Sequence, residues 1–237
     1  LDGSEGQTYI NPDEKLQAEY EQKRVAYLEE KAALAQFVGR ETKTADGVKV
    51  ELCANIGKPE DALKVVECDG EGIGLFRTEF LFMDRPQIPT EEEQFAAYKK
   101  VAETLEGKPV IIRTLDVGGD KEIPYLALEK EENPFLGFRA IRLCLKREDL
   151  YRPQLKALLR ASAYGDIRIM VPMVTCLDEL RAVKNMIAEL KEELKAEGVA
   201  YDENIKVGIM IETPAASLMA DVFAKEADFF SIGTNDL

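Results

Sequence analysis

Between residues 50 and 237, short apolar runs alternate with longer segments that have the spacing of amphipathic helices. The apolar runs are rich in Val, Ile and Phe and are continuous rather than alternating, which is typical of strands buried on both faces. Strands of this kind, separated by helices, form a parallel sheet covered by helices. The pattern therefore predicts an α/β protein with strands within residues 50–56, 72–79, 109–116, 167–174, 206–212 and 229–233.

Local signals mark where two of the intervening helices begin. Thr90 is followed three residues later by Glu93, which is the spacing of a capping box. Thr213 precedes Pro214, as an N-cap residue precedes a first-turn proline. Further helices are expected over residues 59–67, over residues 139–162 and after residue 174, so that six β/α units are present, the last without its helix.

Two architectures accommodate such units, a doubly wound open sheet and a (β/α)8 barrel. No glycine-rich dinucleotide fingerprint follows the first strand, which disfavours the open sheet. Polar residues follow many strands rather than one switch point, and a barrel's catalytic face is built in this way. These residues are Arg77, Arg113, Asp116, Glu212 and Asp236. We therefore expect an incomplete TIM-type barrel with about six of its eight β/α units.

The first 47 residues have a different character. Residues 1–12 contain what resembles a lone strand, Gln7 to Ile10, and we expect them to be the tail of a preceding domain, because a single strand is not stable by itself. Residues 13–47 are expected to form a charged linker helix, which lacks Gly and Pro up to residue 37, and a polar linker. Residues 48–237 then form the partial barrel.

The composition excludes several classes of function. A net charge of −14 argues against nucleic acid or an anionic membrane as the main partner, and no apolar run approaches the ~20 residues of a membrane helix. The four cysteines are far apart, which indicates core thiols in a reducing cytosol and therefore a cytoplasmic protein. The chain contains no histidine, so any chemistry must use carboxylates, Arg, Lys and a metal ion, or a group supplied from elsewhere.

Several basic residues follow the predicted strands. Arg77, Arg113 and Arg139 would offer planar, bidentate recognition of a phosphate or carboxylate. Lys121 could add a point charge, while Gly118 would let backbone amides approach an anion. A surface salt bridge is the alternative for any one arginine, but Arg-Thr recurs at two strand ends. We therefore expect a cationic site.

Carboxylates lie at the same end of the predicted sheet. Glu212 and Asp236 end successive strands and suit Mg²⁺, which takes one or two carboxylates together with substrate oxygens and water. The residues alone leave open a helix-capping role for Glu212 and a turn role for Asp236. Asn235 could donate to the same ligand, and Glu79 and Asp116 are expected to pair with nearby arginines. The set suits a small phosphorylated carboxylate, but it contains no general acid or base and no covalent acceptor.

Six stretches of the chain together resemble enzyme I of the bacterial phosphotransferase system, the family of phosphoenolpyruvate-protein phosphotransferases. They are GIGLFRTEFLFMDR, TEEEQFAAY, RTLDVGGDKEIPY, EENPFLGFRAIR, IMIETPAA and DFFSIGTNDL, in the order of the family and from about residue 50 to residue 237. The opening residues resemble the end of that family's phosphohistidine domain and its linker. Single motifs are shared with pyruvate phosphate dikinase and phosphoenolpyruvate synthase, which have a similar barrel.

The resemblance implies a role for each matching residue. The magnesium ligands are Glu212 and Asp236, and the residues that contact phosphoenolpyruvate are Arg77, Arg113, Lys121, Arg139 and Asn235. It also implies the reaction, in which a kinase-type transferase moves the phosphoryl group of phosphoenolpyruvate to a histidine of its own N-terminal domain. The carrier protein HPr then receives that group for sugar uptake, and the family's barrel domain forms a homodimer.

The chain departs from the family in what it lacks. It has no acceptor histidine, and none of its four cysteines matches the cysteine that protonates the enolpyruvate in the family. We therefore expect a fragment that is inactive alone and holds no catalytic residue of its own. The alternatives are a fragment of a dikinase or synthase, a non-catalytic dimerisation module, and an unrelated barrel such as a pyruvate-type aldolase. The aldolase would explain the carboxylates but not the arginines.

Overall fold

The computed structural model describes residues 1–83, 85–118, 123–126, 128, 131–133 and 137–237. The chain divides into two compact units, Leu1–Lys49 and Val50–Leu237. No helix in the described part of the chain combines the length and the apolar character that crossing a membrane requires.

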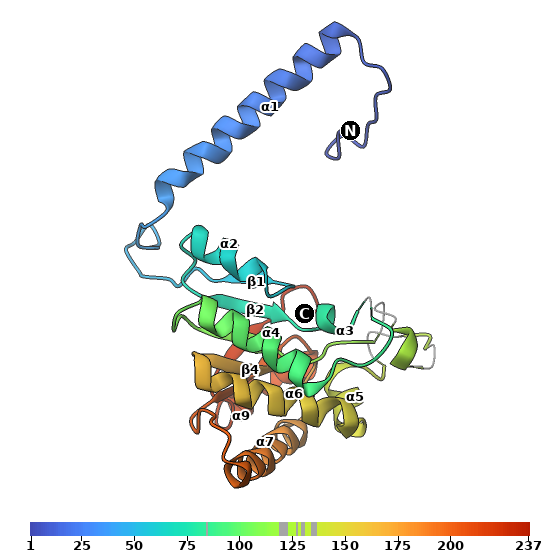
Figure 1. Ribbon diagram of the computed structural model, residues 1–237, viewed down its shortest axis with the longest axis vertical. Helices are drawn as coiled ribbons and strands as arrows, with labels where there is room; N and C mark the ends of the chain where they lie inside the picture. Colours follow the sequence, from blue (N-terminus) through green and yellow to red (C-terminus); the bar gives the residue numbers. More distant parts are fainter. Residues whose placement is uncertain (84, 119–122, 127, 129–130, 134–136) are drawn as a thin grey trace. The chain divides into compact units, whose positions relative to one another are not determined.

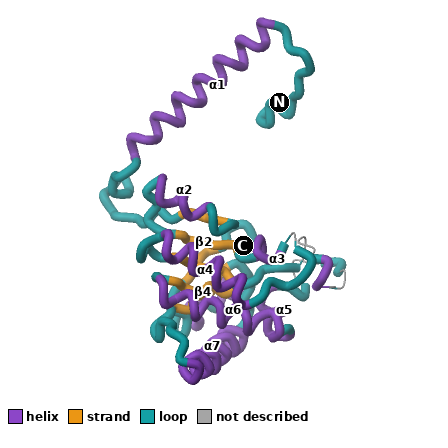
Figure 2. Tube along the Cα trace, in the orientation of Figure 1, coloured by secondary structure: helices purple, strands orange, loops and turns teal. Residues whose placement is uncertain are grey.

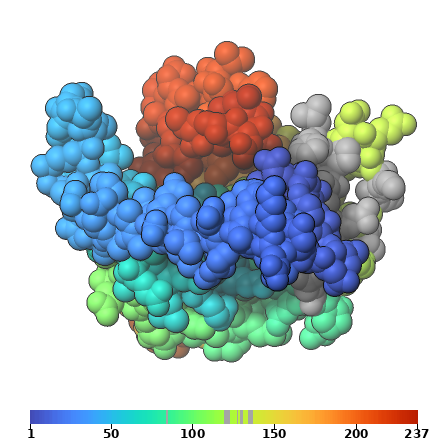
Figure 3. Space-filling model, turned by 90° about the horizontal axis from the view of Figure 1, so that it is seen from above, coloured from blue at the N-terminus to red at the C-terminus, as the bar shows by residue number. Residues whose placement is uncertain are grey.

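The first unit is built on one long helix, α1 (Glu14–Leu34), followed by the short 3-10 helix η1 (Ala35–Phe37). Asp13 caps α1 by accepting a hydrogen bond from the Leu16 amide at 2.8 Å. None of the side chains of α1 is buried, and Figure 3 shows them in blue. The strand expected near residues 7–10 does not form; a single antiparallel bridge joins Asp2 to Gln7 instead, because no further strand is present there to extend the pairing.

The second unit contains a six-stranded parallel sheet whose strand order, β1 to β6, is also the order along the chain (Figure 1). A doubly wound sheet reverses its order at a switch point, so the sequential order confirms the barrel type of fold. The sheet is curled and forms part of a barrel. The strands are β1 (Ala54–Ile56), β2 (Ile73–Arg77), β3 (Val110–Arg113), β4 (Ile167–Val171), β5 (Lys206–Ile211) and β6 (Phe230–Ile232).

Helices connect consecutive strands and cover the sheet, as the purple and orange segments in Figure 2 show. The capping box at Thr90 is confirmed: its amide donates to Glu93 Oε2 at 2.8 Å, and the Glu93 amide donates to Thr90 Oγ1 at 3.2 Å. The helices are α2 (Asp61–Glu67), α3 (Glu79–Phe82), α4 (Glu91–Thr104), α5 (Ala140–Lys146), α6 (Glu148–Ala161), α7 (Leu177–Glu197), α8 (Pro214–Leu218) and α9 (Ala220–Phe223), with short 3-10 turns at Pro124–Leu126 and Ser162–Tyr164.

Helices α4 and α6 lie side by side on the outside of the sheet (Figure 1). Their contact is partly electrostatic, because Arg160 donates to Glu91 at 2.6 Å and to Glu92 at 2.8 Å. Beneath them Tyr98 and Tyr151 are fully buried against the strands. Aromatic groups of this size contribute much of the apolar area that holds a helix on a sheet.

Three details differ from the sequence-based expectation. The helix expected over residues 139–162 is two helices, because Arg147 leaves the helical region with φ −113° and ψ 67°. The first strand is shorter than expected and begins only at Ala54. The interpretation of the cysteines as core thiols holds for Cys144 alone; Cys68 and Cys176 are exposed, and none of the four is in a disulfide.

Candidate functional site

The ends of β2 and β3 bring two arginines together. Arg77 is the last residue of β2, Arg113 is the last residue of β3, and the two are register partners in the parallel pair. Arg77 is exposed and its guanidinium lies 5.5 Å from the centre of the Phe80 ring. Arg113 is only 7% exposed. One arginine is therefore open to solvent while its neighbour is enclosed by protein.

Arg113 belongs to a buried group of four charged residues, Glu79, Arg113, Asp116 and Arg139, which we call the arginine–carboxylate cluster. Its Nη2 lies 2.7 Å from Glu79 Oε1, and its Nη1 lies 3.0 Å from Asp116 Oδ2. The other oxygen of Asp116 accepts from Arg139 Nη2 at 2.7 Å and from Arg139 Nε at 3.3 Å. Asp116 thus bridges two guanidiniums.

Burial gives the cluster its rigidity. Every member is buried, with Arg139 5% exposed and Glu79 1% exposed. Two arginines and two carboxylates balance in formal charge, and ion pairs in such a setting survive only with well-formed hydrogen bonds. The cluster therefore holds two guanidiniums in fixed orientations at the C-terminal end of the sheet.

Three separate segments supply the cluster besides β3. Glu79 begins α3, Asp116 follows β3 in an extended loop, and Arg139 is the residue before α5. Gly118 makes room for Arg139: a Cβ at Gly118 would lie 2.5 Å from Arg139 Cβ, and its φ of +120° is one that side chains disfavour. This steric role of Gly118 was not indicated by the sequence.

Glu212 follows β5 and is 3% exposed. Its Oε1 accepts a hydrogen bond of 2.6 Å from the backbone amide of Met173, which lies in the loop after β4 with a φ of +57°. Burial raises the pKa of the Glu212 carboxyl to about 7, and the negative charges of Asp116 and Asp236 act in the same direction. The positive charge of Arg113 and the hydrogen bond from the Met173 amide act in the opposite direction but do not offset the burial, and a cation would add further compensation.

Asp236 and Asn235 follow β6 and are exposed. The Asp236 amide donates to the Gly233 carbonyl at 3.2 Å. Gly233 brings this turn close to Glu212, because a Cβ on the glycine would lie 2.7 Å from Glu212 Cβ. No group of three or more carboxylate, imidazole or thiolate side chains is positioned to hold a metal within the described ranges. Two carboxylates with free coordination positions nevertheless suit Mg²⁺, which retains water and substrate oxygens.

The structure thus joins most of the residues that the sequence singled out. Arg113 and Arg139 meet through Asp116, and Arg77 is the register partner of Arg113. Lys121 lies outside the residues that the structure describes. Sequence reasoning missed the hydrogen bond from the Met173 amide to Glu212, because a backbone amide leaves no signal in the residue type. It also missed the close approach of Gly233 to Glu212, which only the position of the glycine after a strand could have suggested.

Comparison with known proteins places this geometry in context. A family model described as "PEP-utilising enzyme, PEP-binding domain" matches residues 31–237. The phosphoenolpyruvate-protein phosphotransferase of Geobacillus stearothermophilus is 60% identical over all 237 residues, which are 100% of this chain and 41% of that protein. Proteins of the same name from Priestia megaterium and Bacillus subtilis (strain 168) are 56% and 54% identical over the whole chain, which covers 41% and 42% of their lengths. The chain therefore spans about two fifths of these relatives.

Proposed function

The chain belongs to the family of phosphoenolpyruvate-utilising enzymes, and from this premise we propose that it carries the phosphoenolpyruvate site of a phosphoenolpyruvate-protein phosphotransferase. The observation that supports the proposal most strongly is the pair of strand-end arginines, Arg77 and Arg113, with the second held in the arginine–carboxylate cluster. Phosphoenolpyruvate combines a phosphate with a carboxylate, and planar guanidiniums recognise both groups bidentately.

Arg77 and Arg113 differ in exposure, and we propose different roles for them. Arg77 has its guanidinium in solvent and can close on a phosphate that arrives there. The Nε of Arg113 is buried and has no hydrogen-bond partner among the described residues. Buried donors are almost always bonded, so this donor supports a contact between Arg113 and a ligand. Arg139, Asn235 and Lys121 are proposed to add further contacts to the same ligand.

Glu212 and Asp236 are proposed to hold a magnesium ion. When bound, the ion neutralises negative charge on the phosphate and carboxylate of the substrate. The Met173 amide orients Glu212, and Gly233 lets Asp236 approach it. Burial and the nearby carboxylates of Asp116 and Asp236 raise the pKa of Glu212, and a cation bound between the carboxylates would stabilise the ionised form against the proton.

Phosphoryl transfer demands little covalent chemistry from these residues. The P–O bond to the enol oxygen breaks as a bond to the acceptor forms, and catalysis consists mostly of positioning and of stabilising charge. The chain has no histidine, so a phosphohistidine acceptor would be supplied from outside these 237 residues. The full proposal follows the resemblance: an N-terminal phosphohistidine domain whose tail is residues 1–12, a linker at 13–47, transfer to HPr for sugar uptake, and a cytoplasmic homodimer.

The test is a calorimetric titration with phosphoenolpyruvate, with and without Mg²⁺, on this chain and on the chain extended to the length of its relatives. Glu212→Gln should abolish the effect of Mg²⁺, and Arg113→Met should weaken binding at least tenfold, the usual cost of a lost charge-assisted contact being ~1.5–3 kcal/mol. Arg168→Met is the matched control, because Arg168 also pairs with a carboxylate, Asp166, but near the start of β4. If the extended protein does not bind phosphoenolpyruvate, the proposal is wrong.

A further inference from the structure

Behind the arginine–carboxylate cluster lies a second group of polar residues, all uncharged and all buried: Thr78, Gln94, Tyr98 and Gln154. We call them the amide network. They come from the end of β2, from α4 and from α6. Glutamine is mostly found on protein surfaces, so a glutamine that is 0% exposed, as Gln154 is, requires an explanation.

Gln154 uses its whole amide group. Its Nε2 donates to Thr78 Oγ1 at 3.1 Å and to Tyr98 Oη at 3.2 Å. Its Oε1 accepts from the backbone amide of Leu115 at 2.9 Å. Thr78 in turn donates its hydroxyl hydrogen to the carbonyl of Arg113 at 2.8 Å. The network therefore bonds the backbone on both sides of Thr114, where the chain leaves β3.

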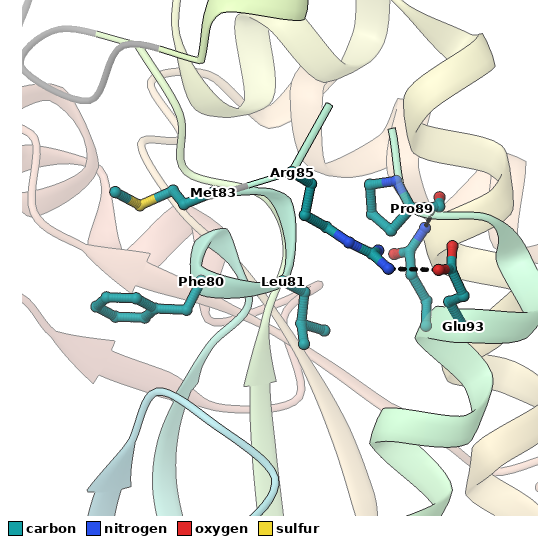
Figure 4. Close-up of a pocket in the computed structure, with 7 residues that line it drawn as sticks. Phe80, Leu81, Met83, Arg85, Pro89 and Glu93 are labelled. Carbon is teal, nitrogen blue, oxygen red and sulfur yellow. Dashed lines mark hydrogen bonds and ion pairs between the residues drawn. The ribbon is translucent and has the colours of Figure 1, made fainter. Parts of the chain in front are cut away.

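The amide network continues from Gln154 through Tyr98 to Gln94, and each group donates to the next. Tyr98 Oη donates to Gln94 Oε1 at 3.1 Å, and Gln94 Nε2 donates to the Pro89 carbonyl at 3.2 Å. Gln94 and Pro89 line a pocket of about 280 Å³ between α3 and the start of α4, and Figure 4 shows Arg85 reaching Glu93 beside them. Because both amide hydrogens of Gln154 have acceptors and its oxygen accepts from a backbone amide, this side chain has little freedom to rearrange.

The amide network bonds the backbone at the point where the hydrogen bonds between β3 and β4 end. The β3–β4 ladder ends with Thr114, whose amide donates to the Met170 carbonyl at 2.9 Å. The next amide, that of Leu115, has left the sheet and is taken by Gln154. The residue after it is Asp116, which bridges Arg113 and Arg139. The amide next to Asp116 is thus held by α6, through Gln154. Thr78 holds the Arg113 carbonyl, and Cys144 Sγ in α5 donates to the Leu115 carbonyl at 3.7 Å.

A helix-packing role alone does not account for Gln154. Its neighbours on α6, Leu155, Leu158 and Leu159, are fully buried apolar residues, so an apolar side chain at position 154 would also pack. We propose that Gln154 is a positioning residue, which fixes residues 113–116 so that Arg113 and Asp116 meet the rest of the arginine–carboxylate cluster. Its consequence for ligand binding depends on the proposed function; its effect on Arg113 does not.

The first experiment needs no ligand. The Nε–Hε signal of Arg113 is recorded by ¹H–¹⁵N NMR in the 237-residue chain and is assigned by its loss in Arg113→Lys. Gln154→Leu and the isosteric Thr78→Val should both shift or broaden this signal. The matched control is Ser162→Ala, which also removes buried bonds to backbone, from the Ser162 hydroxyl to the Leu159 carbonyl and from the Asp202 amide, but at the end of α6; it should leave the signal in place.

The second experiment separates positioning from general destabilisation. In the chain extended to the length of its relatives, Gln154→Leu should weaken phosphoenolpyruvate binding on the order of tenfold, from the loss of several buried hydrogen bonds. Combined with Arg113→Ala, it should weaken binding by a clearly smaller factor, because the part of its effect that passes through Arg113 is gone. Combined with Glu212→Gln, it should weaken binding by the same factor as in the unmodified protein.

The outcomes decide between the two proposals. An unchanged Arg113 signal in folded Gln154→Leu and Thr78→Val overturns the positioning role, as does an undiminished loss of affinity in the Arg113→Ala background. If Gln154→Leu does not fold, Thr78→Val carries both measurements. A moved Arg113 signal in a protein that does not bind phosphoenolpyruvate would keep the positioning role and reject the proposed function.

Discussion

Replacing Asp116 by Asn tests how strongly the arginine–carboxylate cluster is built. Asp116 places its two oxygens on two guanidiniums, at 3.0 Å from Arg113 Nη1 and 2.7 Å from Arg139 Nη2, and all three residues are buried. Asparagine keeps the shape and one oxygen acceptor, but it removes the charge and puts an amide NH₂ against a guanidinium. The cluster then holds two positive charges and one negative charge without solvent to compensate.

The expected cost follows from that geometry. Breaking a buried ion pair by removing one partner costs about 3–5 kcal/mol, and the retained oxygen places Asp116→Asn near about 3 kcal/mol. For a chain of this length, this corresponds to a fall in Tm of roughly 6–12 °C. The loss should persist in high salt, because buried charges are screened little.

Differential scanning calorimetry and urea titration followed by far-UV circular dichroism measure the effect. Asp149→Asn is the control, since Asp149 also accepts two hydrogen bonds from an arginine, Arg147 at 2.9 and 2.8 Å, but on the surface. It should cost less than about 1 kcal/mol and lose even that in salt. A loss for Asp116→Asn no larger than that of the control would refute the view that this bridge organises the site.

Three further predictions rest on single features of the structure. The pKa of Glu212 rises from 4.5 to about 7 on folding, so the folded state binds the proton more tightly and the free energy of unfolding falls as pH rises from about 4.5 to about 7. In urea titrations without Mg²⁺, Glu212→Gln should flatten this part of the pH profile. An unaltered slope would contradict the assignment. Gly118→Ala places a Cβ 2.5 Å from the Cβ of Arg139 and should lower the free energy of unfolding by about 2–3 kcal/mol, measured by calorimetry. Gly107→Ala, at a positive φ but with open space around it, should lower it by about 1 kcal/mol. Equal losses would show that backbone conformation alone matters. Thr90→Ala should lower the free energy of unfolding by about 1 kcal/mol, because the capping box is lost. The control Thr104→Ala removes only a surface hydroxyl bonded to a helix carbonyl and should cost less than about 0.5 kcal/mol. The reverse order would exclude the cap as the cause.

Most of the secondary structure was predicted from short-range sequence signals. The cap at Thr90 depends on residues three apart, and the N-cap of α8 likewise joins Thr213 Oγ1 to the Ala216 amide. Such contacts are present as soon as a turn forms, so the sequence predicts them without knowledge of the fold. The break at Arg147 and the missing strand near Gln7 were not predicted, because neither follows from residue type over a short window.

The site was predicted as a set of residue types at strand ends rather than as a geometry. Pairing of Glu79 and Asp116 with arginines was expected and is confirmed. Nothing in the sequence indicated how far each guanidinium is exposed; in the structure Arg113 and Arg139 are buried and ion-paired while Arg77 is exposed. Their exposure depends on which loops close over each strand end, and loop closure has no signal in the strand itself.

By itself the sequence determined the order of strands and helices, their parallel arrangement and the end of the sheet at which the polar residues gather. These follow from periodicity and from the rule that successive parallel strands point the same way. The bridge that Asp116 makes between Arg113 and Arg139, and the contact of Gln154 with Thr78 across 76 residues of chain, became visible in the three-dimensional structure alone. Those contacts depend on how far the sheet curls and on the depth at which α6 packs against it. Both are set by the fit of many buried side chains at once, which no short stretch of sequence contains.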